Sequence, residues 1–498
     1  MKKHFFRYVL LLLVLGSCTK DFEEMNTNPN RPDQLTDPGL LLPDLIRSVA
    51  NKNLDNSFDR GAIAADQLAT SYASNFSNWF RADAQGYFNW SYYNYIRDLN
   101  EVIRAAEERG YNNYKGIALV LRAWLFQNLT DLYGPIPFRE ASAAGVTGVN
   151  RPKYAQQQDV YAGLITDLEE AAGLLGSTGE GVTGDILFSG SIDRWKKFNT
   201  GLLLRILLRQ SNKVDPTTKM TAILNNGTQY PLFQGYSEQA ALQYLTDRDE
   251  NNMPLYHASN SDYGISSRVT ASLVSRLNSM NDARLFVFAL PASQSGNYTG
   301  AVNGTGDWDD PAKYSPPGML WAPRQYNATL ASTTAAQSIL LSYSEVQFTL
   351  AEAAERGFIP GGSGAAETYY TNGINDQFSY YASRIPSNYT FPTAADIVPG
   401  TGYFDQSTVA YTGNQAQKLE KIYLQKWLSL FLVGYEAWTE WRRTGYPAIV
   451  AGPVSPGYVP SRVLYPADEQ TINADNYREA VQWLGGSDAL NTKLWFAK

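Results

Sequence analysis

The chain has 498 residues, with 41 lysines and arginines against 48 aspartates and glutamates, so its formal charge at pH 7 is −7. A negative balance at this low charge density argues against a nucleic-acid binder, which needs clustered cations to neutralise phosphates. One cysteine and two histidines exclude an intramolecular disulfide, a zinc ribbon, an iron–sulfur centre and a multi-histidine metal site. We therefore expect no metal ion and no cofactor.

The N-terminal residues follow the pattern of a secretory signal. Three cations precede an apolar run over residues 8–15, which is too short for a membrane span of roughly 20 residues. The run ends in Leu15-Gly16-Ser17-Cys18, and small residues before a cysteine at this point resemble a bacterial lipobox. We expect a lipoprotein signal peptide over residues 1–17 and lipidation of Cys18; an ordinary signal with a chance cysteine is the alternative.

The mature chain divides into a tether and one domain. Residues 18–43 are polar and rich in turn formers, which predicts a lipidated N-terminus followed by an extended tether. Residues 44–498 are expected to form a single domain. Its helical scaffold is predicted roughly over residues 44–235 and 335–445, and its ligand-facing loops roughly over residues 250–335 and 385–415.

Apolar residues recur at helical spacing in several segments, which predicts a mainly α fold with little strand. The helices are expected over residues 117–132, 161–175, 195–211, 342–356, 369–381 and 419–434. Gly134-Pro135 ends the first, and Ser342 with Glu345 has the spacing of a capping box at the start of the fourth. Trp438 and Trp441 are expected to extend the last.

Two long segments, residues 294–330 and 385–413, lack any helical or strand pattern. Irregular segments of this length in a compact protein are usually functional or disordered. Large aromatic residues argue against disorder, particularly in the first segment. We therefore expect loops that are ordered on the scaffold.

Five motifs in order along the chain are similar to those of the SusD/RagB lipoprotein family. They are Asp131-Leu132-Tyr133-Gly134-Pro135, Tyr343-Ser344-Glu345-Val346, Tyr370-Thr371-Asn372-Gly373-Ile374, Gly434-Tyr435-Glu436-Ala437-Trp438 and Arg442-Arg443-Thr444-Gly445. The resemblance implies a SusD-like α-helical fold with tetratricopeptide-like helix pairs and long loops. It also implies a non-catalytic protein, anchored by lipid to the outer membrane and facing the cell exterior. Its implied partner is a SusC-like TonB-dependent transporter, to which it delivers captured glycan.

Glycan capture suits the composition of the irregular segments. Sugar C–H bonds pack on the face of an aromatic ring while the hydroxyls reach outward to polar groups, and Trp and Tyr offer large rigid surfaces. The expected ligand-contacting residues are the aromatics Trp79, Trp90, Trp308, Trp321 and Tyr326 and the polar residues Asn78, Arg81 and Arg324. The alternative for each aromatic is packing within the scaffold or against the transporter.

Acidic residues flank one of these tryptophans. Asp307, Asp309 and Asp310 could bond hydroxyls, hold calcium or be solvated, and their spacing is not that of a calcium loop. We favour solvation. In contrast, Trp124, Trp427, Trp438 and Trp441 lie on helical stripes and are expected in the core. Arg442 and Arg443 are expected to pair with carboxylates inside the fold, and the alternative is that they face the transporter.

Three other functions stay open. The same scaffold captures peptides in the RagB branch, although aromatic-rich loops favour glycan. A surface glycoside hydrolase needs two carboxylates about 5–10 Å apart, and nothing in the sequence marks such a pair. A lipid-anchored structural protein without a ligand is the last alternative.

Overall fold

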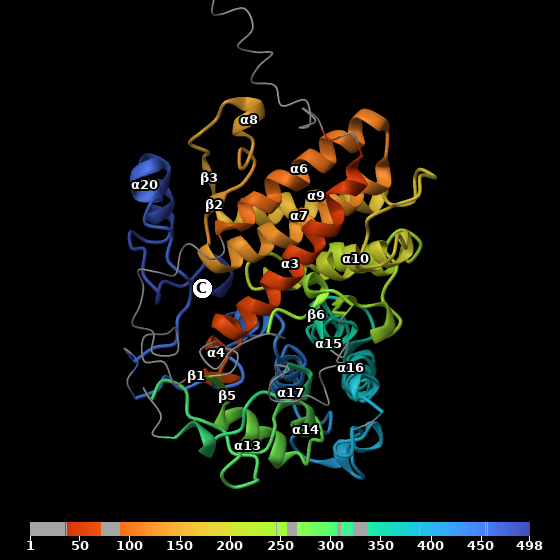
Figure 1. Ribbon diagram of the computed structural model, residues 1–498, viewed down its shortest axis with the longest axis vertical. Helices are drawn as coiled ribbons and strands as arrows, with labels where there is room; N and C mark the ends of the chain where they lie inside the picture. The colour runs from red at the N-terminus through yellow and green to blue at the C-terminus, as the bar shows by residue number, and fades with distance from the viewer. Residues whose placement is uncertain are drawn as a thin grey trace, which may run out of the picture.

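The computed structural model describes residues 35, 37–70, 90–245, 247–255, 266–305, 310–321, 336–387, 389–453, 455 and 457–498. Figure 1 shows helices stacked along the long axis, with α6, α7 and α9 towards one end and α13 and α14 at the other. The mainly helical fold predicted from the spacing of apolar residues is confirmed. No helix in this described part is both long and apolar enough to cross a bilayer.

The first group of helices surrounds one almost fully buried helix. It consists of α3 (Leu42–Asn56), α6 (Tyr92–Arg109), α7 (Asn112–Tyr133), α9 (Gln157–Leu174) and α10 (Ile192–Arg209). The central helix α7 contacts α6, α9 and α10, which explains why apolar residues occupy nearly all of its sides. It ends at Gly134, whose φ of 85° excludes continuation of a right-handed helix, and the predicted stop is therefore confirmed.

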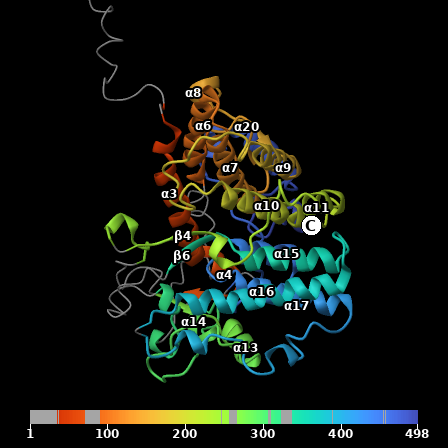
Figure 2. The ribbon, with the colours of Figure 1, turned by 90° about the vertical axis from the view of Figure 1, so that its right-hand side faces the viewer.

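The second group lies below the first. Its members α15 (Tyr343–Glu355), α16 (Gly362–Arg384) and α17 (Gln415–Ser429) run side by side in Figure 2, and α18 (Glu436–Thr444) packs against α17. The predicted continuation of α17 through Trp438 is wrong. The chain turns between the two helices, where Leu432 and Gly434 both have positive φ.

The start of α15 corrects one prediction. The hydroxyl of Ser342 accepts the backbone N–H of Glu345 at 3.0 Å, as an N-cap does. The carboxylate of Glu345 does not complete a capping box, because both of its oxygens accept hydrogen bonds from Arg205 on α10. A long-range ion pair has thus replaced the local contact.

Strands are few and short in the described part of the chain, as predicted. They form three antiparallel pairs: β1 (Leu68–Thr70) with β5 (Ser267–Val269), β2 (Ile136–Pro137) with β3 (Tyr154–Ala155), and β4 (Ala240–Gln243) with β6 (Gln337–Leu341). Each pair joins segments that are distant in sequence or separated by a loop. The strand pairs therefore link segments of chain between the helices, and within the described residues they form no sheet of more than two strands.

Shorter helices and turns connect these groups. They are η1 (Pro38–Leu40), η2 (Ser57–Gly61), α4 (Ala62–Ala64), α8 (Ala144–Thr147), α11 (Thr217–Leu224), η4 (Tyr236–Glu238), η5 (Asp249–Asn251), α13 (Ala271–Ser279), α14 (Leu285–Phe288), η6 (Pro311–Lys313), η7 (Met319–Trp321), η9 (Ala394–Asp396), η10 (Tyr403–Asp405), α19 (Glu469–Ile472), α20 (Ala474–Trp483) and η11 (Trp495–Ala497). Between residues 385 and 413 the described structure consists of turns of this kind, which confirms the predicted irregular segment.

Candidate ligand-binding surface

The scaffold residues next to the predicted ligand loops are neighbours in space. Thr70, which precedes the segment containing Trp79, pairs with Ser267 in the β1–β5 ladder. The residue that follows β5, Thr270, forms a parallel bridge with Ala301, on the stretch that leads towards Trp308. Two candidate loops therefore leave the scaffold beside one pair of strands.

Side-chain hydrogen bonds hold the same stretch in place. The amide of Asn303 donates to the carbonyl of Ile63 at 2.7 Å, and the guanidinium of Arg268 donates to the carbonyl of Pro311 at 3.0 Å. Gly318 lies against α14 so closely that a Cβ there would be 1.6 Å from the carbonyl oxygen of Val287. Only a glycine permits this approach, which fixes the turn η7 and its Trp321.

One strained acidic residue lies at the root of this surface. Asp66, two residues before β1, has a φ of 57°, and its carbonyl accepts a hydrogen bond from the hydroxyl of Thr270 at 2.6 Å. Burial raises the pKa of the Asp66 carboxyl to about 6, although Ser272, Arg276 and Asn303 favour its ionised form. The carboxyl therefore connects β1, α13 and the stretch of Asn303.

The described ligand candidates lie in two different places. Trp321 is only 7% exposed, and its ring packs edge-to-face against Phe431 with centroids 5.3 Å apart. Trp90 is half-buried in a separate aromatic cluster, where its ring contacts Tyr133, Tyr93 and Tyr465 edge-on. The structure therefore buries Trp321 in the core and leaves part of Trp90 accessible, and it does not bring the two rings together.

The other candidates are outside the described residues. These are Cys18, Asn78, Trp79, Arg81, Asp307, Trp308, Asp309, Arg324 and Tyr326. Asp310 is described, and its carboxylate caps η6 by accepting the N–H of Ala312 at 2.9 Å. Within the ranges that the structure covers, no group of three or more potential metal-ligating residues occurs.

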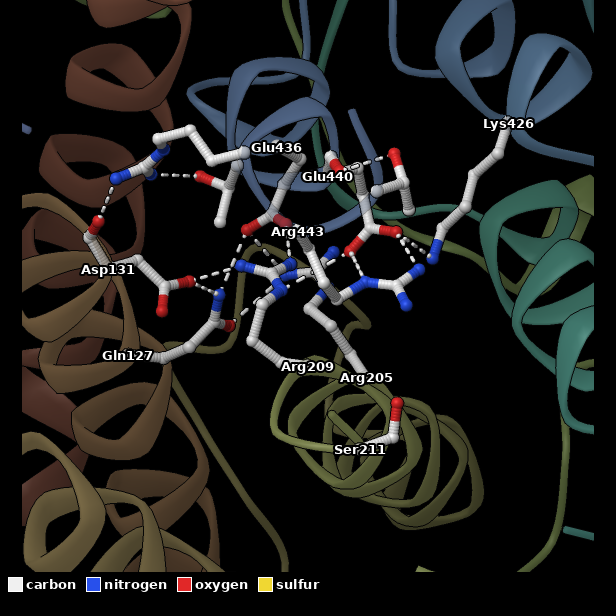
Figure 3. A network of polar contacts seen from close by, with 12 residues as sticks. Gln127, Asp131, Arg205, Arg209, Ser211, Lys426, Glu436, Glu440 and Arg443 are labelled. Carbon is white, nitrogen blue, oxygen red and sulfur yellow. Dashed lines mark hydrogen bonds and ion pairs between the residues drawn. The ribbon is translucent and has the colours of Figure 1, made fainter. Parts of the chain in front are cut away.

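A buried ionic network joins the two groups of helices (Figure 3). Arg209 contacts Asp131, Glu436 and Glu440, and Arg443 contacts Glu440. Arg443 also contacts Glu352 on α15. None of these side chains is more than 8% exposed. The network draws on α7, α10, α15 and α18, so it fixes their relative positions.

The charges of the network balance. Its five carboxylates are Asp131, Glu345, Glu352, Glu436 and Glu440, and the five cations paired with them are Arg205, Arg209, Arg356, Lys426 and Arg443. Burial alone would raise the pKa of Glu440, but Arg443, Lys426 and Arg209 hold that pKa well below its usual range. Arg442 donates to backbone carbonyls, including that of Asp131. Both arginines are buried in the fold. The predicted pairing with carboxylates is confirmed for Arg443, which binds Glu352 and Glu440, and is wrong for Arg442, which has no ion pair with a carboxylate among the described residues.

Sequence reasoning missed a polar cavity of about 420 Å³ beside α17. Tyr446 contributes the one aromatic ring to its lining, together with Glu420 and Lys421. The ammonium of Lys421 already donates to the carbonyls of Ala410 and Thr412, which holds the preceding loop on the helix. No periodicity in the sequence could have indicated this cavity, because the loop and Tyr446 meet only in the folded chain.

A family model described as starch-binding and associating with the outer membrane matches residues 29–466, which is most of the chain. This protein belongs to the SusD-like family. The match includes the buried network, from Asp131 to Arg443, and the strand pair at the loop roots. No curated protein matches the sequence.

Solved structures agree with this assignment. A Bacteroides vulgatus outer-membrane protein, described in connection with nutrient binding, is 27% identical with a TM-score of 0.78, covering 93% of this chain and all (100%) of its own. A SusD homologue from Bacteroides fragilis is 24% identical with a TM-score of 0.77 and the same coverage, 93% and 100%. A chitin-binding protein is 23% identical with a TM-score of 0.75, again covering 93% and 100%. The SusD-like fold of this chain, predicted from its motifs, is confirmed.

Proposed function

We propose that this SusD-like protein captures oligo- or polysaccharide at the cell surface and delivers it, without catalysis, to a TonB-dependent outer-membrane transporter. The observation that carries the proposal is the match of residues 29–466 to a family of starch-binding, outer-membrane-associated proteins. The shared roots of the candidate loops support it, because loops on a rigid scaffold are where binding groups are commonly presented. A chitin-binding protein with this fold makes chitin oligosaccharides a reasonable member of any test panel.

The proposed binding residues are those of the candidate loops together with Trp90. Trp79, Trp308 and Tyr326 would supply ring faces, and Asn78, Arg81 and Arg324 would bond the hydroxyls. Trp90 supplies a partly accessible ring in the structure. Trp321 would act indirectly, since its burial against Phe431 fixes η7 immediately before the segment with Arg324 and Tyr326.

The proposed anchor is a lipid on Cys18, after removal of residues 1–17, followed by a tether. The tether predicted over residues 18–43 must end before η1, because Pro38, Gly39 and Leu42 are buried in the fold. Two or more acyl chains hold a protein stably on a membrane, at about 0.8 kcal/mol per buried methylene. We expect native protein to fractionate with outer membranes and Cys18→Ala to be released in soluble form. Purified outer membranes treated with mild detergent should yield the protein together with a large TonB-dependent transporter.

Affinity electrophoresis in gels containing soluble starch, glycol chitin or other polysaccharides tests the capture. Retardation in one gel without new reducing ends after incubation is the expected result. Release of reducing ends would indicate a hydrolase. Retardation by none of the polysaccharides, combined with saturable binding of a peptide mixture, would favour the RagB-like alternative.

A further inference from the structure

Two tryptophans and three glutamines line a shallow pocket between the start of α9, the end of α20 and η11. The residues that matter are Gln156, Gln157, Gln158, Trp483, Trp495 and Lys498, and the cavity measures about 60 Å³. In Figure 1, α20 and the C-terminus lie well above α13, which follows β5 at the opposite end of the molecule. The pocket shares no element with the roots of the candidate loops.

The two tryptophans differ from those of the core. Buried indoles here donate their N–H to a protein acceptor: that of Trp195 to Asp185 at 2.8 Å and that of Trp427 to the carbonyl of Ala65 at 2.9 Å. Trp483 and Trp495 are half-buried, and neither indole N–H has a hydrogen-bond partner among the residues that the structure describes. Each therefore offers an accessible ring and an unused donor.

One glutamine holds the pocket together. Gln157 is buried, and its amide donates to the carbonyl of Thr130 at 2.7 Å while its oxygen accepts the N–H of Phe496 at 3.4 Å. This clamp fixes η11, and with it Trp495, against the start of α9. The ring of Trp495 also rests beside Tyr161, with centroids 6.1 Å apart, so its orientation is set before any ligand arrives.

The other two glutamines are free to bind. The side chains of Gln156 and Gln158 make no hydrogen bond within the described part of the chain, and both line the pocket. A carboxamide both donates and accepts, which suits a hydroxyl. The lining carries a single charged side chain, Lys498. The oriented indole of Trp495, the second indole of Trp483 and the free carboxamides match a sugar, whose C–H face is apolar and whose edge is polar.

We propose that this pocket is a second saccharide-binding site, taking part of one sugar residue of a longer oligosaccharide. The ring stacks on the indole of Trp483 or Trp495, and hydroxyls bond to Gln156 and Gln158. The cavity is too shallow to enclose a whole residue, so the site binds weakly when alone. The inference rests on the proposed function for its ligand class. A polymer held at one site is present at high effective concentration near the other, so a second weak site would raise the retention of a polymer. A short chain that cannot reach both sites would be little affected.

The test uses full-length protein labelled with 5-fluorotryptophan, which gives one fluorine signal for each of the 11 tryptophans. Trp483→Phe and Trp495→Phe assign the pocket signals, and Trp308→Phe assigns that of the candidate loop. The probes are maltohexaose, cellohexaose and chitohexaose. We expect the Trp483 and Trp495 signals to move together and saturably with at least one hexasaccharide, while the buried Trp195 signal stays fixed.

Variants separate the two sites. In Gln156→Ala/Gln158→Ala, the apparent affinity read at Trp483 should fall roughly tenfold, about 1.4 kcal/mol, and that read at Trp308 should not change. In Trp308→Ala, the pocket signals should still move. If a hexasaccharide shifts the fluorine signal of Trp308 but not those of Trp483 and Trp495, the second site is overturned and the proposed function stays intact. If only the Trp483 and Trp495 signals shift, the loop site is overturned. If none of the three signals shifts, both sites are overturned.

Discussion

Arg205 holds Glu345 by both carboxylate oxygens, with its Nε 2.6 Å from Oε1 and one terminal nitrogen 2.7 Å from Oε2. The two residues are 140 positions apart, on α10 and α15, and each side chain is only 1% exposed. The pair therefore joins the upper and lower groups of helices through the interior. Planar, bidentate geometry of this kind requires arginine.

Removing one member of this pair should destabilise the fold strongly. Arg205→Met leaves Glu345 charged and unpaired in the core, which typically costs about 3–5 kcal/mol. Urea unfolding followed by tryptophan fluorescence measures the loss. Lys219→Met, which breaks an exposed ion pair with Glu169, is the matched control and should cost less than about 1 kcal/mol. Similar small losses in both variants would show that the buried pair contributes little.

Asp376 should make stability depend on pH. Its carboxylate accepts hydrogen bonds from the N–H of Tyr236 and the hydroxyl of Ser344, both at 2.9 Å. Burial nevertheless raises the pKa of Asp376 to about 6 from its ordinary value of 3.8. Because the folded state holds the proton more tightly, this group stabilises the fold fully below pH 3.8, and that contribution is lost as the pH rises through 6.

Asp376→Asn removes the charge but can keep both contacts, its oxygen accepting from Tyr236 and its amide donating to Ser344. We expect the variant to be more stable than the native chain by roughly 1–3 kcal/mol above pH 7. The difference should shrink towards pH 4. Thermal unfolding at several pH values measures it, and an offset that stays constant with pH would contradict the assignment.

Trp321 should matter for folding more than for ligand contact. Trp321→Ala removes a ring that packs against Phe431, and large-to-small changes of this kind cost about 3–5 kcal/mol. Trp321→Phe should recover much of that loss. Chemical denaturation of the two variants gives the comparison. A stable Trp321→Ala protein with normal unfolding and reduced glycan retention would instead place this ring in the binding surface.

Trp308 carries the opposite expectation. If its ring stacks on a sugar, Trp308→Ala should weaken glycan retention by about 1–3 kcal/mol, the scale of a buried apolar side chain. Affinity electrophoresis in a series of polysaccharide concentrations measures the change. Tyr111→Ala removes an aromatic that is 37% exposed on the turn before α7, and it is expected to bind normally. Equal retention of both variants would remove Trp308 from the site.

Gly318 should tolerate no side chain. In Gly318→Ala the new methyl would overlap the carbonyl of Val287, so the turn η7 must move away from α14, at a typical cost of about 1–3 kcal/mol. Gly364→Ala is the matched control, since nothing lies within 4 Å of its added Cβ and the residue is inside α16. That change should be neutral or slightly stabilising. Hydrogen exchange over residues 310–321 should rise only in the first variant.

The sequence predicted the helices well because each amphipathic stripe is local. The helical spacing of apolar residues predicted α7, α9 and α10, and the five motifs indicated the family. The partner of Glu345 could not be predicted, since Arg205 is distant in sequence and the local capping pattern pointed to Ser342. The burial of Trp321 was hidden for a similar reason, because Phe431 is remote along the chain. The break after α17 required Leu432 to adopt a positive φ, which no propensity favours.

The spread of the ionic network along the chain bears on how the protein is made. Glu440 follows Arg209 by 231 positions. A chain that stops before α18 contains Asp131 but lacks Glu436 and Glu440, so the positive charge of Arg209 is incompletely paired. Packing α10 early would trap that charge in a dry interior, which is strongly unfavourable. The acceptors on α18 lie in about the last eighth of the chain, so we expect products truncated before α18 to be unable to settle into a native-like state.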